Sequence, residues 1–301
     1  MPVEYALRAR SLTKYYGSQR GIEDVDLDVH GGEVFGFLGP NGAGKTTTIR
    51  TIVGLLHPTR GHVDVLGLDV RRHGVETRRQ MGYLPGELAL YTHLTGEELC
   101  AFVARMRGGV PAPAYHALAE RLQLDLSRHI RDLSKGNRQK LGIVQAFMHD
   151  PELLVLDEPT GGLDPVVQQE FHALVRETVA RGATVFLSSH ILAEVELMAE
   201  RVGIIADGRL LVVETVEGLK ARALRRIELW FPSAPPVSAL RNASGVTDVT
   251  ATDSFATCTV TGPVTDLLGI AVAHGVVDVR TEEPDLEEIF LGLLRDGGGE
   301  S

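Results

Sequence analysis

The feature that most restricts the fold of this 301-residue chain is the segment Gly39-Pro-Asn-Gly-Ala-Gly-Lys-Thr-Thr47. An apolar run over residues 34–38 comes directly before it and predicts a strand, and residues 45–56 predict a helix. Glycines between a strand and a helix let backbone N–H groups curl around phosphate oxygens, and the helix N-terminus adds favourable positive potential. The sequence therefore predicts a phosphate-binding loop.

Residues of this loop have separate roles in binding a nucleoside triphosphate. Lys45 neutralises charge on the β and γ phosphates, and the Thr46 hydroxyl is placed to hold Mg²⁺. The remaining positions surround the phosphate oxygens, and they are Gly39, Pro40, Asn41, Gly42, Ala43, Gly44 and Thr47.

A pair of acidic residues follows a second buried strand, predicted over residues 153–156. Sheets of alternating strands and helices place their sites at the carboxyl ends of the strands. We expect Asp157 to hold the Mg²⁺ and Glu158 to polarise the attacking water. An acidic turn after a core strand is the alternative for an isolated pair, and the phosphate-binding loop in the same chain makes the catalytic interpretation the stronger one.

The order of predicted elements indicates two domains. Short apolar strands alternate with helices on both sides of a mostly helical stretch near residues 87–148, in which Pro111 and Pro113 separate two helices. This is the pattern of an α/β fold with a mostly parallel sheet and an inserted helical subdomain. A change of composition near residues 221–236 predicts that the first domain covers residues 1–222 and the second residues 223–301.

The second domain is predicted to be a small α+β unit. Apolar residues alternate with polar ones over residues 227–231 and 256–260, as in half-buried strands, and Cys258 falls in the second of these runs. A helix is expected to open at Pro263 and close near Gly275. A last helix is expected over the apolar positions Leu286, Ile289, Phe290, Leu293 and Leu294.

Composition excludes some classes of function. A net charge of −10 argues against a nucleic-acid-binding protein. The chain has two cysteines, Cys100 and Cys258, without metal-type spacing, which fits a reducing compartment. It has no apolar run of about 20 residues and no secretory signal pattern. We therefore expect a cytoplasmic protein that would serve a membrane process by docking onto another protein.

A third segment makes the resemblance to a known family specific. Leu133-Ser134-Lys135-Gly136-Asn137, lying between the glycine loop and the acidic strand, resembles the signature motif of ATP-binding cassette (ABC) ATPases. In that family, the residues that match Ser134 and Gly136 in one subunit cover the γ-phosphate bound by the loop of the other. A hydroxyl, a small residue and a helix N-terminus form a second anion cradle.

Three further segments match the same family in order. Gly162-Leu163-Asp164-Pro165 resembles the loop that links the two composite sites of the dimer, and the resemblance makes Asp164 a nucleotide-site residue. His190 matches the switch histidine, whose neutral imidazole can hydrogen-bond the γ-phosphate and the water. Tyr16 matches the aromatic residue that stacks on adenine, and Tyr15 remains an alternative.

The sequence departs from the family at one position. The family usually has a glutamine after the strand that ends here in Gly82-Tyr-Leu-Pro85, and this chain has Gly86 instead. Either Glu87 reaches inward or water completes the magnesium shell. Both routes leave nucleotide binding intact, so the departure bears on the hydrolysis rate and on coupling.

The resemblance implies the ATP-hydrolysing subunit of an ABC transporter. Such a subunit binds ATP and Mg²⁺, forms an ATP-sandwiched homodimer and drives a separate multi-helix permease from the cytoplasmic face of the membrane. The small C-terminal domain resembles that of drug- and antibiotic-export subunits. The alternatives are an importer cassette, a soluble non-transport ABC ATPase and a simple phosphate-loop kinase, and the signature segment argues against the last.

Overall fold

The computed structural model describes residues 4–222 and 225–282. The chain divides into two compact units, Met1–Val213 and Glu214–Ser301. The boundary predicted from composition, at residues 222 and 223, lies further along the chain. Among the described helices, none combines the length and apolarity that a membrane span requires.

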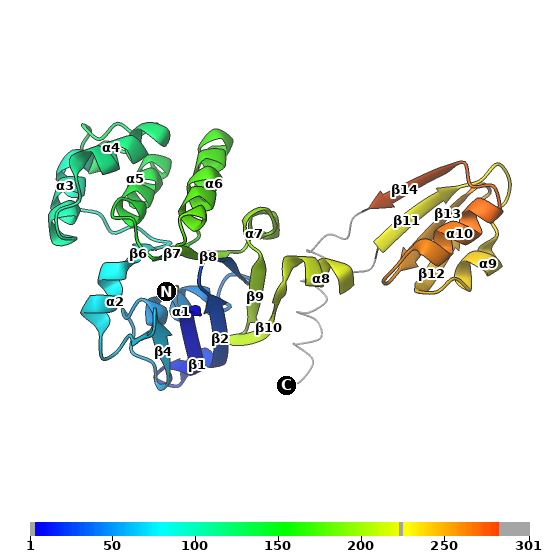
Figure 1. The fold of residues 1–301 in the computed structure, drawn as a ribbon, viewed down its shortest axis with the longest axis horizontal. Helices are drawn as coiled ribbons and strands as arrows, with labels where there is room; N and C mark the ends of the chain where they lie inside the picture. The colour runs from blue at the N-terminus through cyan, green and yellow to red at the C-terminus, as the bar shows by residue number, and fades with distance from the viewer. Residues whose placement is uncertain (1–3, 223–224, 283–301) are drawn as a thin grey trace. The chain divides into compact units, whose positions relative to one another are not determined.

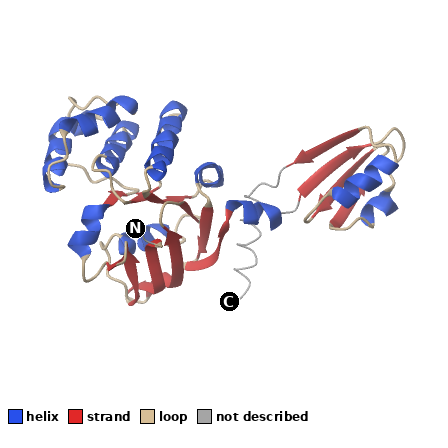
Figure 2. Ribbon diagram, viewed as in Figure 1, coloured by secondary structure: helices blue, strands red, loops and turns tan. Residues whose placement is uncertain are grey.

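A six-stranded sheet forms the centre of the first unit, with strand order β10-β9-β3-β8-β7-β6. Its strands β3, β6, β7, β8 and β9 pair in parallel, which confirms the mostly parallel sheet predicted from the sequence (Figure 2). Strands β3, β7 and β8 are buried along their whole length, as continuous apolar runs predict. The bounds are β3 Val34–Leu38, β6 Met81–Leu84, β7 Leu153–Asp157, β8 Thr184–Ser189, β9 Arg201–Ala206 and β10 Arg209–Thr215.

A second, antiparallel sheet has the order β2-β1-β4-β5. Its longest strands are β1 (Tyr5–Tyr16) and β2 (Gln19–His30), and β4 (Arg60–Val65) and β5 (Leu68–Asp69) complete it. The sequence analysis did not predict β1. Register shifts interrupt the pairing of β1 with both of its neighbours, so the alternation of buried and exposed positions breaks along the strand.

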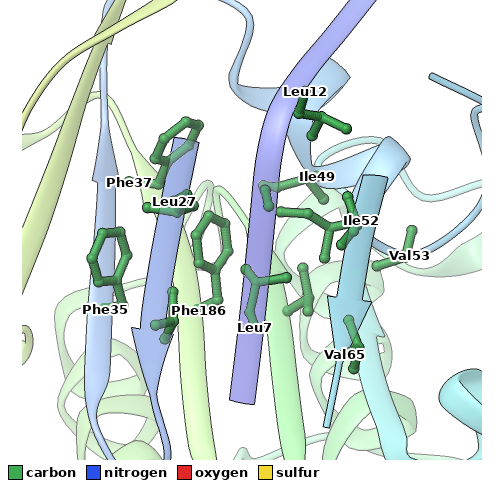
Figure 3. Packing of buried hydrophobic residues seen from close by; sticks show 14 of the residues in the cluster. Leu7, Leu12, Leu27, Phe35, Phe37, Ile49, Ile52, Val53, Val65 and Phe186 are labelled. Carbon is green, nitrogen blue, oxygen red and sulfur yellow. The ribbon is translucent and has the colours of Figure 1, made fainter. Parts of the chain in front are cut away.

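The core of the first unit lies between these two sheets. Figure 3 shows Phe35 and Phe186 of the parallel sheet packed near Leu7 and Leu27 of the antiparallel sheet, with Ile49 of the first helix beside them. All five side chains are essentially inaccessible to solvent. This packing holds the first helix, and with it the glycine loop, between the two sheets.

That helix, α1, runs over Lys45–Ile52. The prediction of a helix to residue 56 is therefore wrong by one turn. Gly54 has a φ of +72°, in the left-handed region that ends helices, and the N–H groups of Leu55 and Leu56 both bond back to the carbonyl of Arg50.

The inserted stretch contains helices α3, α4 and α5. Together with α6 they lie on the side of the parallel sheet away from the antiparallel sheet (Figure 1). Residues 87–94 are not helical, contrary to the extent predicted for this subdomain. The first of its helices begins only at a capping box, in which Thr95 accepts a bond from the N–H of Glu98 and the Glu98 carboxylate accepts one from Thr95. The bounds are α2 Gly74–Gln80, α3 Gly96–Met106, α4 Ala112–Arg121, α5 Lys135–Phe147, α6 Pro165–Ala180 and α7 Leu192–Met198.

The second unit is an antiparallel sheet of order β12-β13-β11-β14, covered by two short helices. After α8, its elements follow the β-α-β-β-α-β order of the split βαβ fold. Ile227, Leu229, Ala256 and Cys258 are fully buried, as their alternation predicts. The predicted last helix lies outside the described residues. The bounds are α8 Val216–Arg222, β11 Arg225–Trp230, α9 Val237–Arg241, β12 Val246–Ala251, β13 Phe255–Val260, α10 Thr265–Ala273 and β14 Asp278–Glu282.

Candidate functional site

The glycine loop connects the end of β3 to the start of α1, as predicted. Gly39 is confined against β9, where a Cβ would collide with the carbonyl of Ile205. Gly44 caps α1 with a φ of +109°, which only glycine adopts without strain. Inside the loop, Lys45 is 6% exposed, and its Nζ donates to Gly39 O at 2.7 Å and to Pro40 O at 3.2 Å. The loop therefore holds a buried ammonium group at its centre.

A cavity of about 740 Å³ opens in front of this loop. Most of the residues predicted for nucleotide binding line it, together with residues that the sequence analysis did not assign. The predicted lining residues are Tyr16, Pro40, Asn41, Gly42, Gly44, Lys45, Thr46, Thr47, Glu158 and His190. The unassigned ones are Gln19, Arg20, Gly21, Gln139 and Gly161. Gly86 and Glu87, discussed above for the magnesium shell, and Lys135 of the signature segment also line the cavity.

The Glu158 carboxylate contacts both Lys45 and His190 at this cavity. Its Oε1 lies 3.4 Å from Lys45 Nζ, and its Oε2 lies 2.7 Å from His190 Nδ1. Its backbone has a φ of +51°, a left-handed conformation that costs a non-glycine residue about 1–3 kcal/mol. The backbone N–H of Glu158 is held by Ser188 O and Ser188 Oγ, each at 3.2 Å. The neighbouring strand thus imposes a strained turn that aims the carboxylate at the loop.

Asp157 is 1% exposed and has one oxygen left without a partner. Its Oδ1 accepts a bond of 2.7 Å from Ser188 Oγ, whereas Oδ2 has no hydrogen-bond partner among the described residues. A buried carboxylate oxygen without a donor is costly, and a hydrated cation would satisfy it. The exposed Thr46 hydroxyl lines the same cavity. These two oxygen donors fit a Mg²⁺ that keeps several waters.

The described residues contain no larger metal cage. No group of three or more His, Cys, Asp or Glu side chains in residues 4–222 and 225–282 is arranged to hold a metal ion. A magnesium ion here would therefore depend on Thr46, Asp157, water and the phosphates of its ligand.

Gly86 lies directly beside the free oxygen of Asp157. A Cβ at position 86 would lie 3.3 Å from Asp157 Oδ2 and 3.4 Å from its Cγ, tighter than an ordinary van der Waals contact. The glycine has no side chain to fill this space. Glu87 is exposed and lines the cavity, so both alternatives for completing the magnesium shell, Glu87 or water, remain compatible with the geometry.

The two adjacent tyrosines have different surroundings. Tyr16 is 46% exposed and lines the cavity, and its ring packs against Gly21 so closely that a Cβ there would lie 2.8 Å from Tyr16 Cε2. The Tyr15 hydroxyl instead donates to Glu23 at 2.7 Å, a hydrogen bond that raises the pKa of the tyrosine. Of the two tyrosines, Tyr16 lines the cavity and Tyr15 does not.

Three predicted residues do not line the cavity of the single chain: Ser134, Gly136 and Asp164. Ser134 caps α5 by accepting a bond of 3.2 Å from the N–H of Asn137, and Asp164 caps α6 by accepting one of 3.0 Å from Val167. A Cβ at Gly136 would lie 2.6 Å from the carbonyl oxygen of Gly162. The signature segment and the Gly162–Pro165 loop are therefore in direct contact within one chain.

Three more predicted residues lie behind the cavity wall or beside it: Gly39, Ala43 and Asp157. Sequence reasoning also missed two residues that build the site. Ser188 fixes Asp157 and the Glu158 turn, and Gln139 donates from α5 to Pro159 O at 2.9 Å. The only sequence signal for Ser188 was its place at the end of a buried strand, and Gln139 had none.

The buried parallel sheet, the loop around Lys45 and the acidic end of β7 define a phosphate-loop nucleotide-binding protein. Comparison with known proteins makes the class specific, because the family described as ABC transporter matches residues 22–161. The chain is 38% identical over 225 residues to a bacitracin transport ATP-binding protein of Bacillus licheniformis, covering 74% of each. It is 32% identical to a linearmycin resistance ATP-binding protein of Bacillus subtilis over 95% of this chain and 97% of that one.

A solved structure described as the ATP-binding subunit of an ABC transporter superposes with a TM-score of 0.67 at 35% identity, covering 71% of this chain and 92% of that one. The chain belongs to the ATP-binding subunits of ABC transporters. The fold class and the family predicted from the motifs are confirmed.

Proposed function

We propose that this chain hydrolyses Mg-ATP as a homodimer and thereby drives a membrane permease that exports a drug-like or antibiotic compound. The proposal of ATP hydrolysis rests on one observation: Lys45, Glu158 and His190 line the same cavity. Asp157, directly before Glu158 in the chain, has a carboxylate oxygen without a hydrogen-bond partner among the described residues. A positive group, a carboxylate and an imidazole within hydrogen-bonding reach of one another form a competent phosphoryl-transfer site.

Binding of the triphosphate depends on groups already in place. The backbone N–H groups of Asn41, Gly42 and residues 44–46, at the N-terminus of α1, bind phosphate oxygens, and the Lys45 ammonium balances their charge. Tyr16 stacks on the base at the far end of the cavity. Thr46 and Asp157 would hold a magnesium ion, and when bound it would supply positive charge against the phosphates.

Hydrolysis needs a water in line with the γ-phosphate. The Glu158 carboxylate accepts a proton from this water, and His190 orients the carboxylate through the 2.7 Å contact between its Nδ1 and Glu158 Oε2. Charge that develops on the phosphoryl oxygens is stabilised by Lys45, which moves little because the carbonyls of Gly39 and Pro40 hold it. Most of the rate enhancement comes from this preorganised charge rather than from covalent chemistry.

In the proposed homodimer, each subunit supplies residues of its signature segment to the nucleotide site of the other subunit. Ser134 and Gly136 are at the N-terminal end of α5 but do not line the cavity of their own chain. In the dimer they would cover the γ-phosphate bound by the other subunit, with the Asp164 loop beside them. ATP is then part of the interface, so its hydrolysis separates the subunits and moves a permease docked on the cytoplasmic face of the membrane through the helical subdomain.

Export is favoured over import by the relatives that cover the whole chain. The linearmycin resistance protein matches 95% of this chain, so the similarity extends into the small C-terminal unit as well as the ATP-binding unit. That protein is named for resistance to linearmycin. An importer cassette remains the alternative, and the identity of the permease would distinguish the two.

The test of this proposal uses the purified full-length chain. We expect ATP hydrolysis that requires Mg²⁺, and an ATP-bound dimer in size-exclusion chromatography coupled to light scattering when hydrolysis is blocked by chelation. A chain that binds no nucleotide in the presence of Mg²⁺, or that stays monomeric with ATP under every condition, would refute the proposal.

A prediction about Gly86 follows from its contact with Asp157. Changing Gly86 to glutamine should alter the rate of ATP hydrolysis, or its stimulation by the permease, by roughly tenfold while changing ATP affinity far less, because the new side chain enters the magnesium shell and not the phosphate loop. Gly86→Ala is the matched control, since it adds the crowding Cβ without the amide. Equal rates for the glutamine variant and wild type, with the permease present, would contradict this prediction.

A further inference from the structure

Glu194 is an acidic side chain that the mechanism above does not use. It lies in the first turn of α7, five residues after the end of β8, and does not line the nucleotide cavity. Both of its carboxylate oxygens are engaged: Oε1 accepts a bond of 2.6 Å from Thr160 Oγ1, and Oε2 accepts one of 2.9 Å from Ser189 Oγ. A carboxylate with a hydroxyl on each oxygen joins two segments that are far apart in sequence.

The first of these segments is the turn that carries His190. Ser189 Oγ donates to Glu194 and at the same time accepts a bond of 2.9 Å from the N–H of Ile191. Both hydrogen bonds connect Ser189, directly before His190, to a residue that follows His190 in the chain. They fix the backbone from which the imidazole reaches Glu158.

The second segment is the turn that carries Glu158. Thr160 lies two residues after Glu158, in a turn closed by a bond from Gly161 N to Glu158 O at 3.3 Å and by one from Leu163 N to Thr160 O at 3.0 Å. The same turn continues into Gly162, whose carbonyl oxygen abuts Gly136 of the signature segment. Thr160 therefore lies in the chain between Glu158 and the Gly162 segment, which is expected to contact the other subunit.

We propose that Glu194 is a positioning residue. It holds the turn that contains Glu158 and Thr160 at a fixed position relative to the turn that contains Ser189 and His190. The hydrogen bond between Glu158 and His190 then forms only while both turns keep these positions. It touches neither nucleotide nor water and acts through Thr160 and Ser189. A displacement of the Gly161–Asp164 loop on dimer closure is transmitted by the same carboxylate to His190. The inference rests on the proposed ATP hydrolysis at this site.

The test is a double-mutant cycle on the full-length chain with Glu194→Ala and His190→Ala. Phosphate release is followed under single-turnover conditions, so that slow rates remain measurable. We expect Glu194→Ala alone to lower the hydrolysis rate about tenfold with an unchanged KM for ATP, and to have less than about a twofold effect when His190→Ala is already present. Additive effects of the two substitutions would overturn the proposal, since a general loss of stability is additive.

Three further variants keep the test decisive. Glu194→Gln retains the shape and an oxygen acceptor, so it should recover most of the rate, and a rate as low as that of Glu194→Ala would contradict positioning. If Glu194→Ala does not fold, Ser189→Ala replaces it in the cycle with the same expected coupling to His190. Glu200→Gln, an exposed neighbour, should match wild type. A wild-type chain with no Mg-dependent hydrolysis would contradict the proposed function and not this inference.

Discussion

Glu158→Gln is expected to lower the rate of ATP hydrolysis by about 100- to 10,000-fold while Mg-ATP still binds. The glutamine keeps an oxygen for His190 but cannot accept a proton from the attacking water, and general-base catalysis contributes a factor of this size. Binding should persist, because Lys45 keeps its bonds to the carbonyls of Gly39 and Pro40 when its 3.4 Å contact with Glu158 loses its charge. ATP should therefore accumulate in a closed dimer.

The measurements are phosphate release, equilibrium binding of ATP, and molar mass in solution with and without ATP. Glu120→Gln, on the exposed surface of α4, is the matched control for loss of one carboxylate and should behave as wild type. Near-normal hydrolysis by the Glu158 variant would exclude this residue as the base. Loss of ATP binding together with hydrolysis would show instead that Glu158 is needed to keep the loop in shape.

Lys45→Ala has the second large expected effect, and the quantity that it changes is the affinity for Mg-ATP. Removing the buried ammonium should weaken binding of Mg-ATP by about 10- to 100-fold, because hydrogen bonds to a charged group contribute about 1.5–3 kcal/mol each. The rate of ATP hydrolysis should fall by at least the same factor as the affinity. The fall in affinity distinguishes this variant from Glu158→Gln, for which only turnover should fall.

Isothermal titration with Mg-ATP checks this expectation. Arg71→Ala removes a positive charge from an exposed site of the same unit and should leave the affinity unchanged. A thermal unfolding curve separates loss of binding from loss of fold. If the Lys45 variant binds Mg-ATP as tightly as wild type and is folded, the assignment of the cavity to the triphosphate is wrong.

The parts of the site that sequence reasoning predicted are those built from neighbouring residues. The loop around Lys45 is one continuous segment, and its glycines, its lysine and the following helix are required together by phosphate binding. The acidic pair Asp157 and Glu158 follows its strand directly. The helix after the loop was predicted one turn too long because the apolar pattern continues through Leu55 and Leu56 while the backbone has already turned at Gly54.

Contacts between distant segments were not predictable in the same way. Strand β1 of the antiparallel sheet was not predicted, because its register shifts hide its periodicity. Ser188 reaches Asp157 across two paired strands, and Glu194 joins Thr160 to Ser189, with no spacing in the sequence that marks either contact. The choice between Tyr15 and Tyr16 likewise depended on which ring borders the cavity.

The sequence by itself determined the chemistry of this protein: a phosphate loop, an acidic strand end and a signature segment in the order of the ABC family. These are local patterns, and each consists of residues that are adjacent in the chain. Only the tertiary structure decided which groups meet, as in the contact of Gly86 with Asp157 and the bond of Glu158 to His190. Such contacts follow from the pairing of β7 with β8 and from packing between the two sheets, which bring together residues that the chain itself keeps apart.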